Sequence, residues 1–237
     1  MSLLEVDSIS MSFGAMNVLK TVGFSLEPGS ITGIIGPNGA GKTTLFNVIN
    51  GIYSPSSGRI TLCNSDITGK SVDSIARSGI GRTFQVARVF GEMTLVENLL
   101  VAARASGLPR RDAQERSIEL LSLARLSHLA EKTAFEISGG QKKLLEFVRT
   151  LIRNPQLVLL DEPFNGVSPA LIEVLVDMVL RLNESRGTTF LLISHEMPHV
   201  ARLCRSVIVM SERTVIARGT PEEVKSNPAV ISAYLGR

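Results

Sequence analysis

A glycine-rich run near position 40 is the first stretch of the 237-residue chain whose residue types and spacing could do chemistry. It fits the pattern G-x-x-x-x-G-K-[ST] at every position, and it lies between an apolar run and a helix-forming run. Glycines let backbone N–H groups curl around phosphate oxygens, and a helix directs its positive end at the anion. We predict a nucleoside-triphosphate site rather than a simple turn. This phosphate loop comprises Gly36, Pro37, Asn38, Gly39, Ala40, Gly41, Lys42, Thr43 and Thr44.

Three side chains of the phosphate loop have expected roles of their own. Lys42 should reach the β and γ phosphates, and the hydroxyl of Thr43 should bind Mg²⁺. Thr44 is a further candidate for contact with phosphate. Nucleotide and metal are therefore expected at the same loop.

A pair of carboxylates follows a second apolar run, Leu-Val-Leu-Leu at 157–160. Asp161, at the end of the expected strand, could hold Mg²⁺ through water. Glu162 could orient or deprotonate the attacking water. The alternative is a carboxylate pair that ends a strand in solvent. The four apolar residues before it, in a chain with a phosphate loop, favour the catalytic interpretation.

A histidine follows a third apolar run by two residues. A single histidine after a strand is more often a surface or core residue than a catalytic one. The strand order, however, predicts that the loop carrying His195 opens at the same sheet edge as the phosphate loop and the carboxylates. We therefore expect His195 to contact the γ-phosphate, and we assign no role to His128 or His199.

These residues need strands and helices to position them. Short apolar runs at 31–35, 157–160 and 190–193 alternate with helical patterns, which predicts an α/β fold with a mainly parallel sheet and flanking helices. The N-terminal stretch to about Pro28 and the segment 58–62 predict an antiparallel β layer. We expect one domain, with an α/β core over residues 1–85 and 156–237 and an inserted helical subdomain over 86–155.

Three helices can be outlined from their boundary residues. One is expected over 43–50, closed by Gly51, and one over 142–153. A third should begin after Ser168 as N-cap and end before Gly187. Its expected buried face consists of Leu171, Leu175, Met178 and Leu182.

Composition excludes several classes of protein. With 44% apolar residues the chain should be globular, and a charge of +3 without a basic cluster argues against nucleic acid as a partner. Cys63 and Cys204 have no disulfide or metal-ligand spacing, so both are expected to be small buried residues. Neither a signal peptide nor an apolar run of about 18 residues occurs, so we expect a cytosolic protein that needs a partner to act at a membrane.

The five residues Ile137, Ser138, Gly139, Gly140 and Gln141 resemble the signature motif L-S-G-G-Q of ABC ATPases. Serine and glycines at a helix N-terminus form a second anion site. One chain with one triphosphate site would use it to close over the nucleotide of a second chain. These residues alone would also fit an ordinary capped helix start. Together with the phosphate loop, the carboxylates and His195 in this order, they favour the resemblance.

The resemblance covers essentially the whole chain and implies ATP and Mg²⁺ as cofactors. Gln85, in Arg82-Thr-Phe-Gln, is similar to the Q-loop glutamine, which reaches Mg²⁺ and the hydrolytic water. Phe13 is similar to the aromatic residue that stacks on adenine, although a core aromatic of the first strand layer is the alternative. The family also implies a head-to-tail dimer in which residues 138–141 of one subunit cover the ATP of the other.

Within the family, the chain is most similar to the ATP-binding subunits of branched-chain amino-acid uptake systems. The segments that carry this likeness are 82–85, 89–99, 219–223, 227–228 and 233–236. The likeness implies a second ATP-binding subunit (a copy or a paralogue), integral membrane permease subunits and a separate substrate-binding protein. It also implies a place on the cytoplasmic face of the membrane. Residues 86–93 are candidates for contact with the permease.

The chain departs from the family pattern at three places. Ile137 replaces leucine, Ser168 stands where many members have aspartate, and the segment between Gln85 and Ser138 looks short. The second change lies in a loop that contacts the other subunit in the family, and the third bears on which permease the chain meets.

A urea or amide importer or a lipid exporter would use the same motifs, so these alternatives stay open. A DNA-acting ABC ATPase would need long heptad segments, and none is present in the sequence. A translation-type relative would need two such domains, and this sequence carries one. A non-hydrolytic switch would lack Glu162 or His195, and both are present. The helix opened by Thr220 is either regulatory or only packs against the core.

Overall fold

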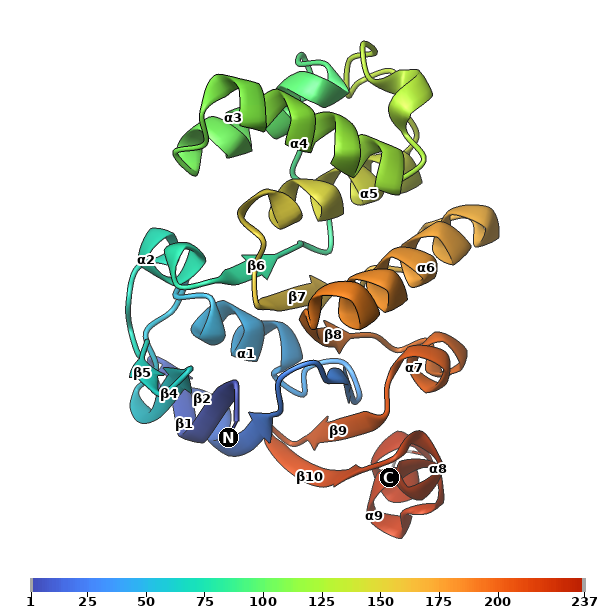
Figure 1. Ribbon diagram of the computed structural model, residues 1–237. Coiled ribbons are helices and arrows are strands. Elements are labelled where there is room, and N and C mark those ends of the chain that lie inside the picture. Colours follow the sequence, from blue (N-terminus) through green and yellow to red (C-terminus); the bar gives the residue numbers. More distant parts are fainter. Residues whose placement is uncertain (1, 236–237) are drawn as a thin grey trace.

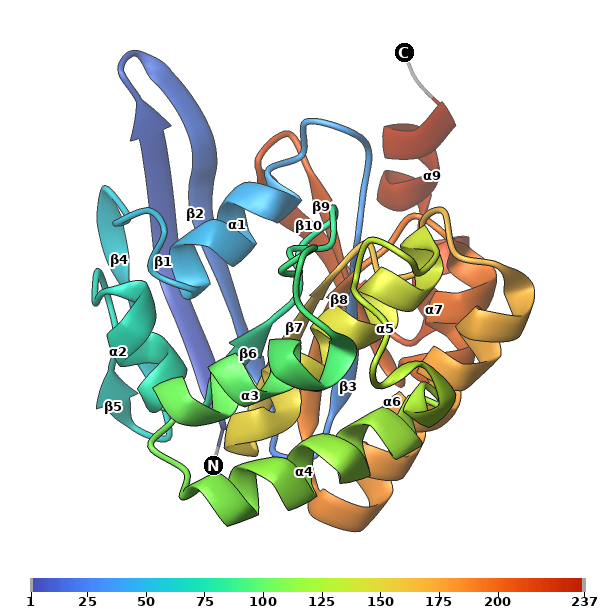
Figure 2. The same cartoon turned by 90° about the horizontal axis from the view of Figure 1, so that it is seen from above.

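The computed structural model describes residues 2–235 and shows two β-sheets with helices between and around them (Figures 1 and 2). The larger sheet has the order β10-β9-β3-β8-β7-β6, in which β9, β3, β8, β7 and β6 run parallel and β10 is an antiparallel edge strand. Its strands are β3 (Ile31–Ile35), β6 (Ile80–Arg82), β7 (Leu157–Asp161), β8 (Thr189–Ile193), β9 (Ser206–Ser211) and β10 (Thr214–Gly219).

The smaller sheet is antiparallel, with the order β2-β1-β4-β5. Its strands are β1 (Leu4–Phe13), β2 (Met16–Leu26), β4 (Ser57–Leu62) and β5 (Ser65–Asp66). It lies to one side of the larger sheet with α1 (Lys42–Ile49) between them, as Figure 2 shows. The antiparallel layer expected from the N-terminal stretch and segment 58–62 is therefore present.

The remaining helices surround the larger sheet. In Figure 1, α3, α4 and α5 gather above the sheet as a separate helical layer, and α6 and α7 lie to its right. The bounds are α2 (Val72–Arg77), α3 (Leu95–Ala105), α4 (Arg110–Leu123), α5 (Gly139–Thr150), α6 (Pro169–Arg186), α7 (Met197–Leu203), α8 (Pro221–Ser226) and α9 (Pro228–Leu235), with 3₁₀ turns η1 (Ser127–Leu129) and η2 (Leu151–Arg153).

The larger sheet separates two hydrophobic cores. Along β7, Val158 and Leu160 belong to the core shared with the helices, whereas Leu157 and Leu159 belong to the core shared with α1 and the antiparallel layer. Alternate side chains of a strand point to opposite faces, so a strand covered on both faces must be apolar throughout. This explains why the strands that carry the site appear in the sequence as continuous apolar runs.

The α/β fold with an added antiparallel layer is as predicted, and three helix details differ. The helix expected over 142–153 begins at Gly139 and gives way to a 3₁₀ turn after Thr150. The helix expected over 43–50 is shifted by one residue, to Lys42–Ile49. Ser168 is the N-cap of α6, but its side chain makes no capping hydrogen bond. The division into a core and a subdomain over 86–155 remains our proposal.

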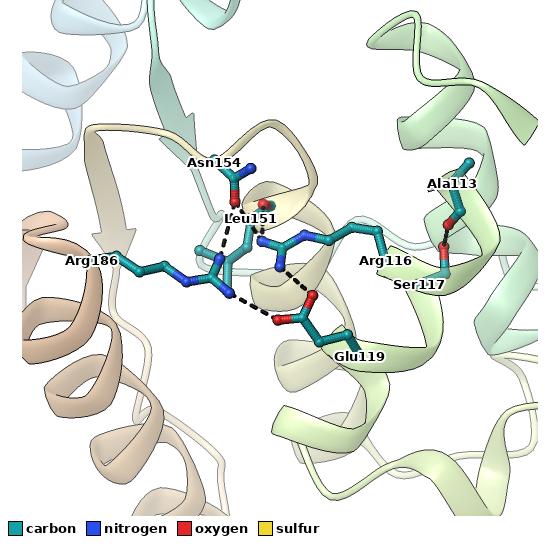
Figure 3. Close-up of polar contacts among 7 residues, drawn as sticks. All are labelled: Ala113, Arg116, Ser117, Glu119, Leu151, Asn154 and Arg186. Atoms are coloured by element: carbon teal, nitrogen blue, oxygen red, sulfur yellow. Dashed lines mark hydrogen bonds and ion pairs between the residues drawn. The ribbon is translucent and has the colours of Figure 1, made fainter. Parts of the chain in front are cut away.

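The helical layer is tied to the C-terminal end of α6 by polar side chains (Figure 3). Arg116 of α4 donates to Glu119 at 2.6 Å and to the Oδ1 atom of Asn154 at 2.6 Å. Arg186, the last residue of α6, donates to the same Asn154 oxygen at 3.0 Å and to Glu119 at 2.9 Å. We call Arg116, Glu119, Asn154 and Arg186 the α4–α6 cluster.

One sequence expectation about the cysteines is wrong. Cys204 is buried, and burial raises the pKa of its thiol to about 12. Cys63 is exposed, because it lies in the turn between β4 and β5 with a φ of +48°. Within residues 2–235, no helix is long and apolar enough to cross a membrane.

Candidate functional site

The order of the larger sheet brings the predicted site residues to one edge. The phosphate loop follows β3, and His195 follows its parallel neighbour β8. Glu162 follows β7 and Gln85 follows β6, which are the next two parallel strands. Parallel strands end at the same side of a sheet, and ligands of such sheets bind outside their carboxyl ends. The structure therefore collects four loops from distant parts of the sequence.

Two glycines of the phosphate loop are required by its backbone. Gly36 has a φ of +148°, and a Cβ atom there would lie 2.0 Å from the carbonyl oxygen of Met210. Gly41 has a φ of +96°, and a Cβ atom there would lie 2.8 Å from the carbonyl oxygen of Val18. Only glycine avoids both the strained φ and the clash. The loop thus runs against β9 and β2.

The first turn of α1 is open to an anion. Its N-cap is Gly41, which makes no side-chain capping bond, and the first turn holds no acidic residue. Helix N-termini leave backbone N–H groups without intrahelical acceptors, and their dipole favours negative charge. The start of α1 therefore suits a phosphate group.

Lys42 lies folded back on the phosphate loop. Its Nζ atom donates to the carbonyl oxygens of Gly36 at 2.7 Å and Pro37 at 2.9 Å. Burial lowers the pKa of Lys42, and the charges of Glu162 and Asp161 oppose this shift. The ammonium group is thus held near the carboxylates by backbone oxygens that a phosphate could replace.

Asp161 forms a buried ion pair with Arg82, at the end of the neighbouring strand β6. The Nη2 atom of Arg82 lies 3.2 Å from Oδ2 of Asp161, and both side chains are at most 3% exposed. The Oδ1 atom of Asp161 and the Nε and Nη1 atoms of Arg82 are buried without a hydrogen-bond partner. Burial raises the pKa of Asp161, against the opposing effect of Arg82. We call Arg82 and Asp161 the β6–β7 pair.

The free Oδ1 atom of Asp161 is a test of the predicted magnesium site. Mg²⁺ prefers oxygen ligands and is bound in proteins by one or two carboxylates together with substrate phosphates. Among residues 2–235 no group of three or more His, Cys, Asp or Glu could hold a metal ion by itself. A buried carboxylate oxygen without a partner, next to a phosphate site, fits a metal that binds together with its substrate.

Glu162 and His195 are in direct contact. The Nδ1 atom of His195 lies 2.8 Å from Oε2 of Glu162. Glu162 has a φ of +48°, and its N–H donates to the carbonyl oxygen of Ile193 at 3.0 Å. A residue other than glycine in this region is strained, and such strain gathers at functional sites. The turn after β7 thus holds the Glu162 side chain against the loop after β8.

Two charged residues of α5, which the sequence analysis did not predict to belong to the site, make hydrogen bonds to the loops after β6 and β7. Glu146 is 2% exposed and accepts from the N–H groups of Phe84 at 3.1 Å and Arg88 at 2.7 Å. Lys143 donates to the carbonyl oxygens of Glu162 at 2.9 Å and Asn165 at 2.7 Å. Glu146 could have been recognised from the sequence as the one charged residue in the otherwise apolar run 144–148, which is buried in the structure.

The signature residues form the N-terminus of α5. Ser138 is the N-cap, and it exchanges two hydrogen bonds with Gln141 in a capping box. A Cβ atom on Gly140 would lie 2.8 Å from Leu171 of α6, whereas a Cβ atom on Gly139 would meet nothing within 4 Å. Gly140 therefore permits helix packing, and Gly139 presents bare backbone at the surface.

Phe13 and Gln85 are both exposed. The ring of Phe13 is 45% exposed and meets Tyr53 edge-on, with the ring centroids 5.0 Å apart. Phe13 is therefore not a core aromatic residue, which was the alternative. Gln85 lies in the loop after β6, at the same sheet edge as Asp161 and Glu162.

An open pocket of about 520 Å³ adjoins the phosphate loop. Besides loop residues it is lined by Lys20 of β2, by Ser211 at the end of β9, and by Glu212 and Arg213 between β9 and β10. None of these four was predicted, because the two segments meet only in the folded chain. Lys20 and Arg213 bring two positive charges to the pocket, and Glu212 brings one negative charge.

Comparison with known proteins shows similarity to one family along the whole chain. A family model described as ABC transporter matches residues 19–165, and one described as branched-chain amino acid ATP-binding cassette transporter matches residues 214–237. The high-affinity branched-chain amino acid transport ATP-binding proteins BraF of Pseudomonas aeruginosa and LivG of Salmonella typhimurium are 37% and 38% identical to it. Each alignment covers 99% of this chain and 98% of the relative.

A solved structure is similarly close. The ADP conformation of an ATP-binding cassette of an ABC transporter superposes with a TM-score of 0.89 at 36% identity, over the full length of both chains. That cassette binds a nucleotide on the same fold.

Proposed function

We propose that this chain, which belongs to the ABC transporter family and is an ATP-hydrolysing subunit of it, powers the uptake of branched-chain or related amino acids. One observation carries the catalytic part of the proposal: the Glu162 carboxylate is held by Nδ1 of His195 at the sheet edge that carries Lys42. The amino-acid part is supported by the match at residues 214–237 and by the names of the relatives.

Each predicted site residue has a role in the proposed reaction. The N–H groups of the phosphate loop and the start of α1 bind the phosphates, and Lys42 exchanges its carbonyl partners for phosphate oxygens. Thr44 adds a further hydroxyl, and Phe13 stacks on the adenine ring. Binding energy thus comes from both ends of the nucleotide.

Water activation falls to Glu162. Its carboxylate orients the attacking water and accepts its proton, while His195 fixes the carboxylate through Nδ1. A bond from the same ring to the γ-phosphate would be donated by Nε2 and requires a proton on both ring nitrogens. Gln85 contacts the same water. Thr43, Gln85 and the free oxygen of Asp161 would hold Mg²⁺. When bound, Mg²⁺ neutralises charge that develops on the phosphate oxygens.

We propose that the site is completed by a second ATP-binding subunit, either a copy or a paralogue. Ser138 to Gln141 sit at the N-terminus of α5, with Gly139 bare at the surface. A helix N-terminus of this kind suits the γ-phosphate of a nucleotide held by another chain. ATP would then bind between two subunits and hold them together.

The proposed contact with membrane permease subunits is the segment 86–93. Val86 is 79% exposed, Phe90 is 46% exposed and Met93 is 37% exposed. Glu146 accepts from the N–H groups of Phe84 and Arg88, which lie on either side of Gln85, so a movement at Gln85 would reach the apolar side chains of the segment. Through the permease the chain would lie at the cytoplasmic face of the membrane and serve a separate substrate-binding protein.

The test combines an ATP-trapped variant with transport. Glu162→Gln should bind ATP–Mg²⁺ without turnover and elute as a dimer in size-exclusion chromatography, and adding Ser138→Arg should return it to a monomer. The trapped variant, captured from native membranes, should bring polytopic membrane proteins with it. Cells that lack the chain should lose uptake of radiolabelled leucine, isoleucine and valine.

Other outcomes would separate the alternatives. Loss of urea or amide uptake with normal leucine uptake would assign the chain to a urea or amide importer. An altered lipid distribution across the membrane would indicate an exporter. Capture of soluble partners alone, with no ATP-dependent dimer, would contradict the transporter assignment.

A further inference from the structure

One lysine of α5 holds the segment that carries Glu162. The Nζ atom of Lys143 donates to the carbonyl oxygen of Glu162 at 2.9 Å and to that of Asn165 at 2.7 Å. The N–H group of Asn165 also donates to the carbonyl oxygen of Glu162, at 3.4 Å. A single ammonium group thus binds both ends of the turn 162–165, which follows β7.

The backbone of Glu162 needs such support. Its φ of +48° lies in the left-handed region, which a residue with a side chain keeps only where its surroundings hold it there. Its N–H donates to the carbonyl oxygen of Ile193 at 3.0 Å, and its carboxylate contacts His195 at 2.8 Å. Lys143 binds the remaining polar group, the carbonyl oxygen. Of these three partners, Lys143 is the one that comes from the helical layer.

Helix α5 also packs closely on the chain just beyond this turn. A Cβ atom on Gly140 would lie 2.8 Å from Leu171 of α6 and 3.4 Å from Cγ1 of Val167, in the segment that joins β7 to α6. Closely packed groups pass small displacements to one another. The position of α5 and the position of the turn 162–165 are therefore linked by packing at Gly140 and by hydrogen bonds at Lys143.

The place of Lys143 in α5 is unfavourable for the helix itself. The first turn of α5 holds no acidic residue, and Lys142 and Lys143 follow it directly. A cation near a helix N-terminus opposes the helix dipole. Burial lowers the pKa of Lys143, and the charges of Glu146 and Glu162 oppose this shift. A half-buried lysine at this position needs a reason other than the stability of α5, and its two bonds to the turn 162–165 supply one.

We propose that Lys143 is a positioning residue for ATP hydrolysis, which fixes the turn 162–165 from α5 so that the Glu162 carboxylate faces the attacking water. Hydrogen bonds from a charged donor are stronger than neutral ones, and two of them end on this turn. A displacement of about 1 Å in a reacting group can slow a reaction by about 100-fold. The inference rests on the proposed role of Glu162. It makes the position of that carboxylate depend on the helix that begins with the signature residues.

The first test removes the ammonium group and keeps the apolar stem. Lys143→Met should lower kcat for ATP hydrolysis by about 10- to 100-fold and leave the KM within about twofold, because Lys143 acts through Glu162 and binds no part of the nucleotide. Lys143→Arg, which can still donate to both carbonyl oxygens, should recover most of the loss. Phosphate release by the full chain, with the subunits that co-purify with it, measures these variants.

The neighbouring lysine gives a matched control. The Nζ atom of Lys142 lies 5.9 Å from the ring centroid of Phe135, away from the turn 162–165. Lys142→Met makes the same chemical change one position earlier in α5, and its kcat should stay at the wild-type value. A variant that melts earlier than wild type is assayed at a temperature where it is folded.

A second test separates positioning from general support of the fold. In Glu162→Gln the group that Lys143 positions is already gone, so adding Lys143→Met should leave the residual single-turnover rate unchanged. The double variant should still form the ATP-dependent dimer. A residue that only supports the fold would slow both backgrounds by the same factor, and that result would overturn the inference.

The other outcomes are distinguishable. If Lys143→Met has the wild-type kcat while Glu162→Gln has lost turnover, the inference is wrong and the proposed function stands. A raised KM with unchanged kcat would make Lys143 a nucleotide-binding residue and would also overturn the inference. If Glu162→Gln hydrolyses ATP at the wild-type rate, the proposed function fails at that residue, and the inference fails with it.

Discussion

The β6–β7 pair and the α4–α6 cluster are both built around arginine and carboxylate, and they differ in how far their hydrogen-bonding capacity is used. In the α4–α6 cluster, both oxygens of Glu119 accept from arginines, the Asn154 oxygen accepts from two, and one buried atom, Nε of Arg116, has no partner. In the β6–β7 pair a single contact joins Arg82 to Asp161, and three polar atoms are buried without partners.

We propose that this difference separates a structural network from a ligand site. A buried polar atom without a partner costs free energy, so a folded chain retains one mainly where something else will bind it. The α4–α6 cluster is partly open to water and joins two helices. In the β6–β7 pair, one of the atoms without a partner is a carboxylate oxygen, Oδ1 of Asp161, close to Lys42 of the phosphate loop. We propose that the α4–α6 cluster supports the fold and that this oxygen would bind Mg²⁺ together with the nucleotide.

The largest difference between the two regions should appear in catalysis. Glu162→Gln, next to the β6–β7 pair, should slow ATP hydrolysis by about 10²- to 10⁴-fold, because it removes the group that accepts the proton of the water. Glu119→Gln in the α4–α6 cluster should leave kcat within about twofold. Phosphate release measures both. A tenfold loss in Glu119→Gln would show that the far cluster also governs turnover.

Stability should show the next largest difference. Asp161→Asn leaves the guanidinium of Arg82 buried without its counter-charge, which should lower the free energy of unfolding by about 3–5 kcal/mol. The urea midpoint measures it. The double change Arg82→Met with Asp161→Leu removes both charges and should recover most of the loss. No recovery in the double variant would mean that packing, rather than charge, supports the site.

Glu119→Gln should have a much smaller effect on stability. The Glu119 side chain is 54% exposed, so its ion pairs are screened by water, and the expected loss is about 0–1 kcal/mol. Added salt should shrink the difference from wild type further. The exposed pair Arg111 and Glu115 on the same helix gives a matched control through Glu115→Gln. A loss for Glu119→Gln above that of Asp161→Asn would reverse the comparison.

The smallest expected effect is in the pH dependence of the α4–α6 cluster. Burial alone would raise the pKa of Glu119, but the hydrogen bonds and charges of Arg116 and Arg186 outweigh it and hold the pKa below its usual value. A lowered pKa in the folded state stabilises the protein above the unfolded-state pKa, and this stability is lost as pH falls through the folded-state pKa. Wild type and Glu119→Gln should therefore converge in acid, as urea unfolding at a series of pH values would show.

The parts of the molecule predicted from sequence are those in which neighbours along the chain decide the structure. The phosphate loop is one continuous segment, so its glycines and the apolar run before it directly predict its backbone conformation. Asp161, Glu162 and His195 each follow a continuous apolar run, because strands buried on both faces are easy to recognise. The roles of these residues remain predictions, although the structure brings them to one edge.

The parts that escaped prediction depend on partners far apart in sequence. Arg82 pairs with Asp161 across 79 positions, and Glu146 binds the N–H of Phe84 across 62. Arg186 reaches Glu119 across 67 positions. The spacing of apolar residues along the sequence does not predict such long-range contacts. The error at Cys63 is of another kind: with Asn64 it forms the two-residue turn between β4 and β5, so it is exposed by a local feature that the sequence analysis did not recognise.

The central place of β3 has a consequence for synthesis of the chain. This strand pairs with β8 and β9, whose residues lie about 155 to 175 positions later. At typical elongation rates of roughly 5–20 residues per second, the phosphate loop leaves the ribosome roughly ten to thirty seconds before either neighbour exists. During that interval both edges of β3 are unpaired and apolar. The nascent chain therefore offers a site for chaperones long before it offers one for ATP, and an incomplete chain that ends before β8 cannot assemble the nucleotide site.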